Sequence, residues 1–161
     1  MEIEQITNKQ EWEEFVLQQP YALFVQSCHY GEFYESLAEK SWIFGIYDAG
    51  KLIGGSLVLS VHAKRGNFIF LPYGPILPLA EKEEALKQFI IFLKKFAQKN
   101  KYDFIRVSPF LNDNEENRGV FKKTGFRSAP MHILAETTWL LDLSASHHDL
   151  LMSMNKNHRY L

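Results

Sequence analysis

The segment from Trp42 to Pro72 carries the pattern of three consecutive β-strands. Apolar stretches at 42–47, 52–63 and 68–71 are separated by the turn-forming triplets Asp48-Ala49-Gly50 and Arg65-Gly66-Asn67. Turns this short join antiparallel neighbours, so the sequence predicts an antiparallel meander. A sheet must bury its apolar face against another layer, which limits the chain to folds in which other elements cover this meander.

Helical patterns flank the predicted meander on both sides. The first covers residues 8–19, begins with a capping box at Thr7–Gln10 and stops before Pro20. The second places Tyr30, Phe33, Tyr34 and Leu37 on one face, and the third covers residues 81–100. The rest of the order is a strand at 104–107, a helix through Val120 and Phe121, a strand at 132–143 and a helix from about Ser146. The sequence therefore predicts an α/β (α+β) fold with a mixed central sheet flanked by helices.

The composition is that of one globular domain over residues 1–161. A chain of 161 residues buries about 70% of the surface that its unfolded state exposes. Its net charge of −1 argues against a strongly basic nucleic-acid module, and its 14% aromatic content against a disordered tail. The single cysteine favours a reducing compartment, and from the sequence pattern we expect neither a leader sequence nor a transmembrane segment. We expect a cytoplasmic protein that can visit the inner membrane surface.

Two features near strand ends are candidate ligand contacts. Tyr73-Gly74-Pro75 follows a strand, where α/β sheets open a crevice for ligands; a structural tight turn explains it equally well. Arg106 lies on a strand that ends at Ser108, and its guanidinium can hold a phosphate or carboxylate through two hydrogen bonds. An ion pair with Asp103 is the alternative role for Arg106.

Cysteine and histidine provide no reactive or metal site by their spacing. Adjacent helical residues point about 100° apart, so His147 and His148 cannot chelate a metal as an i, i+4 pair does. Cys28 precedes His29, but no acid is placed to orient that histidine as a base. We expect no metal and no catalytic thiol.

The segment Asn114–Phe126 resembles the fourth-helix motif of the GNAT N-acetyltransferases in the spacing of its Asn, aromatic and Gly-Phe residues. Gly125 can end the helix in a left-handed conformation, and Phe126 can bury its ring at the start of a strand. Phe121 stands where the resemblance would place a proton-donating tyrosine. The loop Leu77–Glu84 lacks the glycines of a pyrophosphate cradle, and its carboxylates would repel phosphate. We therefore expect a GNAT-like fold with no acetyl-CoA site.

Further motifs, in order along nearly the whole chain, resemble the first half of the FemA/FemX/FemB (FemABX) peptidyltransferases. They are Gln26-Ser27 with Tyr30-Gly31, Ile53-Gly54-Gly55, Pro72-Tyr73-Gly74-Pro75-Ile76, Arg106-Val107-Ser108-Pro109, Gly125-Phe126 and Met154-x-Lys156-x-x-Arg159-Tyr160. The resemblance implies an enzyme that moves an amino acid from aminoacyl-tRNA to the stem peptide of a UDP-linked or lipid-linked peptidoglycan precursor. It implies aminoacyl-tRNA as co-substrate and no other cofactor.

The same resemblance implies the substrate-binding residues and leaves the catalytic ones unidentified. Ser108 stands where many relatives carry an acid, Tyr30 where they carry a Trp, and Tyr34 near the place of a Lys. The implied substrate-binding residues are Glu32, Tyr34, Tyr73, Gly74, Pro75, Arg106, Ser108, Lys156 and Arg159.

The C-terminal residues 146–161 resemble the start of the basic helix that connects the first GNAT-like domain of the family to a second one. The resemblance implies that this chain supplies the acceptor-binding domain, and that catalysis needs a second GNAT-like domain or a partner chain. Two alternatives remain open. One is a stand-alone GNAT-type N-acyltransferase with another acyl donor, and the other is a non-catalytic module that binds the precursor.

Overall fold

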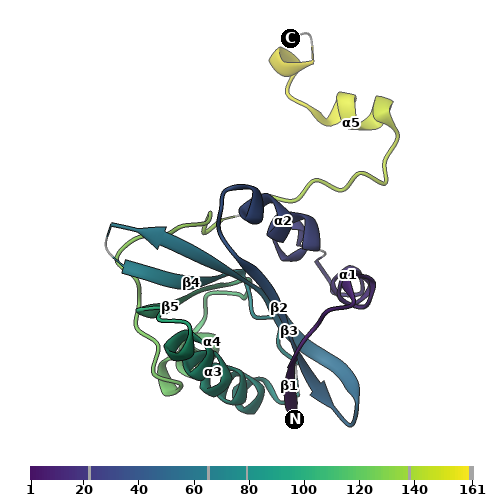
Figure 1. Ribbon diagram of the computed structural model, residues 1–161. Coiled ribbons are helices and arrows are strands. Elements are labelled where there is room, and N and C mark those ends of the chain that lie inside the picture. Colours follow the sequence, from purple (N-terminus) through teal and green to yellow (C-terminus); the bar gives the residue numbers. More distant parts are fainter. Residues whose placement is uncertain (22, 65, 79, 138, 160–161) are drawn as a thin grey trace.

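The computed structural model describes residues 1–21, 23–64, 66–78, 80–137 and 139–159. Its centre is a five-stranded sheet in the order β1-β2-β3-β4-β5 (Figure 1). Strands β1 to β4 pair antiparallel, and β5 lies parallel to β4. The predicted mixed sheet and antiparallel meander are confirmed. The strands are β1 Glu2–Gln5, β2 Ser41–Asp48, β3 Lys51–Ala63, β4 Gly66–Tyr73 and β5 Phe104–Pro109.

Helices cover both faces of the sheet. Helices α1 and α2 lie on one face, and α3 and α4 lie on the other (Figure 1). Helix α5 lies apart from the sheet, at the end of an extended stretch. None of the helices within the described residues combines the length and the apolar character needed to cross a membrane. The helices are α1 Lys9–Leu17, η1 Phe24–Gln26, α2 Cys28–Ser36, α3 Lys82–Lys99, α4 Glu115–Lys123, α5 His147–Ser153 and η2 Lys156–His158.

The larger core lies between α3 and the sheet. Leu86, Phe89 and Leu93 of α3 are fully buried, at the spacing that places them on one face of the helix. They pack against side chains such as Phe44 and Ile69 from the facing strands. The parallel pairing of β4 and β5 requires a crossover, and α3 supplies it.

A loop backbone approaches the middle of β3 closely. Glycines inside a strand indicate a bulge or a close approach of another backbone. Here the Gly55 amide donates to the Ile76 carbonyl at 2.9 Å, and a Cβ on Gly54 would lie 2.7 Å from the same oxygen. The register of β2 against β3 also shifts between Ile46 and Tyr47. The loop after β4 is thereby fixed against the sheet.

The first helix begins differently from the prediction, and one strand was missed. The Asn8 side chain, not Thr7, caps α1 by accepting from the amides of Gln10 and Glu11. Strand β1 has four residues, too few for a periodic pattern, and forms because β2 offers it a partner.

The expected strand at 132–143 is wrong, and Phe126 does not begin a strand. The described residues from 126 to 146 form an irregular segment. A strand is stable only when a neighbouring strand hydrogen-bonds to it. An alternating sequence pattern by itself therefore does not produce a strand. Here the carbonyls of Met131 and Ala135 are bonded by side chains from the sheet. The predicted helix end at Gly125 is confirmed, since that residue has φ of 90°.

Several predicted features include positions outside the described residues. These are Arg65 in a predicted turn, Leu79 in the loop before α3, Thr138 in the expected strand, and Tyr160 and Leu161 at the end of the C-terminal motif.

Candidate functional site

The carboxyl ends of β4 and β5 bring most of the predicted site residues together. The two strands run parallel, so they end at the same edge of the sheet. Pro72 pairs with Ser108, and Tyr73 pairs with Pro109. The turn Tyr73-Gly74-Pro75 therefore lies beside Ser108, with Arg106 two residues earlier on β5.

A buried glutamine holds this turn in place through hydrogen bonds. The Gln26 side chain is fully buried; its Nε2 donates to the Pro72 carbonyl, and its Oε1 accepts from the Leu57 amide at 2.8 Å. The Gln26 carbonyl in turn accepts from Trp12 Nε1 at 2.6 Å. Gln26 was not among the predicted site residues. The sequence feature that could have identified Gln26 is that it is the polar residue at the end of the apolar run beginning at Tyr21.

Gly74 is required by the close packing of the turn. A Cβ at this position would lie 2.2 Å from Ser56 Oγ and 2.9 Å from Gln26 Nε2. Both Gly74 and Pro75 are buried, and the bond between them is cis. Gly74 and Pro75 fix the backbone of the turn. Tyr73 is the residue of the turn whose side chain carries a hydrogen-bonding group.

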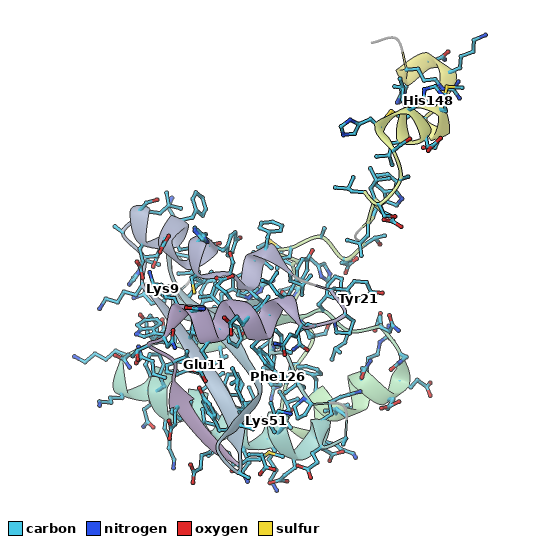
Figure 2. The ribbon with its side chains drawn as sticks, turned by 90° about the vertical axis from the view of Figure 1, so that its right-hand side faces the viewer. Lys9, Glu11, Tyr21, Lys51, Phe126 and His148 are labelled. Atoms are coloured by element: carbon cyan, nitrogen blue, oxygen red, sulfur yellow. The ribbon has the colours of Figure 1, made fainter. Side chains whose placement is uncertain are left out.

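Aromatic rings line the site on the side of α2. Tyr30 packs against Tyr34 with ring centroids 5.3 Å apart, and Tyr73 packs against Phe110 at 5.2 Å. Tyr21, half-exposed beside α1 in Figure 2, contacts Phe110 from the edge of the group. Burial, together with a hydrogen bond to Tyr34, raises the pKa of Tyr30 to about 12. The Tyr30 phenol is therefore neutral at physiological pH.

Arg106 is directed at a neighbouring backbone instead of at an acid. Its Nη2 donates to the Met131 carbonyl. The carboxylate of Asp103 accepts instead from the Asn67 amide, at 2.7 Å. The alternative ion pair between Arg106 and Asp103 is therefore absent among the described residues. Arg106 therefore directs an N–H donor at a backbone carbonyl oxygen of the irregular segment that follows α4.

Three predicted site residues lie elsewhere. Glu32 accepts from Lys9 Nζ at 2.7 Å, which ties α2 to α1. Arg159 donates to the carbonyls of Met152 and Met154 at the end of α5, and Lys156 is exposed in η2. The segment that carries His148 lies well away from the sheet in Figure 2.

Cys28 is unsuited to act as a nucleophile. The residue is buried, and burial together with the nearby Glu13 carboxylate raises its thiol pKa to about 12. At neutral pH almost none of this thiol is present as the reactive thiolate.

The start of α3 provides no side-chain cap and carries acids. Glu83 and Glu84 lie in its first turn, and Lys82 donates to Asn117 Oδ1 at 2.9 Å. Phe121 packs on Phe126 with ring centroids 5.6 Å apart. The Lys82 contact thus joins the start of α3 to α4, and Phe121 and Phe126 both pack against the core.

The gathered groups are suited to binding. Arg106 and Tyr73 donate to oxygen acceptors, and the rings beside them offer an apolar wall. The described residues contain no group of three or more His, Cys, Asp or Glu side chains arranged for a metal ion.

Comparisons with known proteins agree with this description. The family model described as "FemAB family" matches residues 7–161. No curated protein sequence matches the chain. A crystal structure of FemX is similar with a TM-score of 0.70 and 20% identity, over 79% of this chain and 32% of that chain. This chain therefore spans about a third of the FemX chain.

Acetyltransferase structures are also similar in fold. A probable acetyltransferase matches with a TM-score of 0.56 and 18% identity, over 91% of this chain and 100% of that one. AAC(6')-Iy, solved with a CoA-containing bisubstrate analog, matches with a TM-score of 0.60 and 15% identity, over 86% of this chain and 98% of that one. These similarities confirm the predicted GNAT-like fold.

Proposed function

The chain belongs to the FemAB family, and on this premise we propose that its β4–β5 end binds the stem peptide of a peptidoglycan precursor. The precursor is UDP-linked or lipid-linked, and the transferred amino acid comes from aminoacyl-tRNA. In this proposal residues 1–161 form one GNAT-like domain that supplies the acceptor site. A second GNAT-like domain or a partner chain completes the enzyme, and residues 146–161 begin the connection to it.

One observation carries this proposal. Two hydrogen-bond donors, Arg106 and Tyr73, lie at the carboxyl ends of adjacent parallel strands next to an apolar aromatic wall. A peptide offers the matching groups, because its carbonyl oxygens accept hydrogen bonds and its side chains fill apolar pockets. Both donors come from motifs on which the family resemblance depends.

The chain's own residues would act by positioning. An aminoacyl ester is already activated, so its attack by an amine is accelerated by holding the two reactants in place. Arg106 and Tyr73 would fix the peptide backbone, and Gln26 would keep Tyr73 in place through the Pro72 carbonyl. No acid–base group is assigned to this domain.

Isothermal titration calorimetry with a UDP-linked muropeptide tests the proposal. We expect Arg106→Ala to weaken binding by about 1–3 kcal/mol, or roughly 5- to 150-fold, the effect of losing a charged hydrogen bond. Arg118→Ala is the matched control, because Arg118 is exposed on α4 and pairs only locally with Asp113. Equal affinities of the wild type and Arg106→Ala would show that Arg106 contributes nothing to binding beyond the hydrogen bond that it already makes to the Met131 carbonyl.

The same titration with acetyl-CoA separates the proposal from the stand-alone N-acyltransferase. The acids in the first turn of α3 disfavour phosphate at that helix end. We therefore expect no binding of acetyl-CoA. Saturable binding would favour the N-acyltransferase, and binding of neither ligand would contradict both functions.

A further inference from the structure

Residues 127–137, which we call the strap, lie across the candidate site. The Met131 carbonyl accepts from Arg106, and the Ala135 carbonyl accepts from Tyr73 Oη at 2.9 Å. Between these two points, Leu134 packs against the buried cluster on which Tyr30 and Tyr34 also pack; its members are Leu57, Leu59, Phe68 and Phe70. The strap thus uses both donors and the apolar wall at the same time.

The contacts of the strap are of the kinds that a bound peptide makes. Two backbone carbonyls accept hydrogen bonds, and one apolar side chain between them packs against the core of the sheet, while the backbone bends at Met131, Ile133 and Leu134. The five residues from Met131 to Ala135 are joined by four steps along the chain, which span at most about 14 Å when extended. A ligand of about five residues can therefore reach the same donors.

The strap is held weakly enough to be exchanged. Leu134 is half-buried, and every other residue of the strap is exposed. The contact between His132 Nε2 and Glu136 Oε1, at 2.7 Å, lies within the strap and does not tie it to the sheet. A segment with few buried contacts opens at low free-energy cost compared with the core.

We propose that the strap is an internal occupant of the site, which an extended peptide ligand displaces by taking over its hydrogen bonds to Arg106 and Tyr73. The inference rests on the proposed function of this site. The apparent affinity for the ligand then equals the intrinsic affinity multiplied by the fraction of molecules in which the strap is open.

Leu134→Ala tests this competition, with Ile133→Ala as the matched control because Ile133 is 41% exposed in the same strap. The rate of trypsin cleavage after Arg127, at the start of the strap, followed by mass spectrometry, reports opening of the strap without ligand. Calorimetry reports binding of a UDP-linked muropeptide. We expect faster cleavage at Arg127 and roughly 5- to 30-fold tighter binding in Leu134→Ala. Ile133→Ala should match the wild type, and in the wild type the ligand should speed cleavage at Arg127.

The outcomes separate the two proposals. Binding with unchanged or lower affinity in Leu134→Ala, or protection of the strap by the ligand, would overturn the competition while leaving the peptide site in place. An unchanged rate of cleavage at Arg127 in Leu134→Ala would also overturn it. Faster cleavage without binding by either protein would refute the peptide site, and the competition with it.

Discussion

Replacing Gln26 by Leu removes the polar support of the candidate site while nearly preserving side-chain volume. In the structure the Gln26 side chain serves two buried backbone groups, the Pro72 carbonyl and the Leu57 amide. Each group left without a partner costs about 1–3 kcal/mol. The expected loss in the free energy of unfolding is therefore about 2–6 kcal/mol, a large part of the roughly 5–15 kcal/mol of a typical domain.

Urea unfolding followed by tryptophan fluorescence measures this loss, because Trp12 is fully buried and donates to the Gln26 carbonyl. Gln10→Leu is the control, since Gln10 is exposed and its side chain donates to Glu14 within α1. It should change stability by no more than about 0.5 kcal/mol. A loss below about 1 kcal/mol in Gln26→Leu would refute the view that this side chain holds the turn.

Two further predictions concern Gly74 and Cys28. Gly74→Ala should lower stability by about 1–3 kcal/mol in thermal unfolding, because the new Cβ meets Ser56. Gly119→Ala is the control and should be neutral or stabilising, because a Cβ there meets nothing within 4 Å. Equal effects of the two substitutions would contradict the packing argument. The Cys28 thiol should resist alkylation at pH 8 until the protein unfolds, and rapid alkylation of the folded protein would contradict its burial. Burial raises its pKa from the ordinary value of 9.0 to about 12, so its contribution to stability is complete below pH 9 and is lost as pH rises toward 12.

The arrangement of Tyr73, Gly74, Pro75, Arg106 and Ser108 could be predicted from the sequence. All five lie on or directly after two strands separated by one long helix, and such a crossover makes the strands parallel. Their shared edge of the sheet follows from that pairing.

Glu32 was predicted as a site residue from the family resemblance, but the geometry of its helix turns its side chain away from the site. Glu32 and Tyr34 are two residues apart on α2, so their side chains point in different directions around the helix. In the structure Tyr34 faces the aromatic cluster, while Glu32 pairs with Lys9.

The sequence by itself determined the elements whose pattern is local. The meander, the buried face of α3 and the helix end at Gly125 follow from periodicity and from backbone preferences within a few residues. These features need no information about distant parts of the chain.

Only the tertiary structure decided what the residues after Gly125 do and how the site is supported. The strand pattern at 132–143 was not realised, because the Met131 and Ala135 carbonyls found donors in Arg106 and Tyr73 instead of a neighbouring strand. Gln26 reaches across 46 residues of sequence to Pro72. A hydrogen bond between distant residues depends on how whole elements pack, and that information is spread over the entire chain.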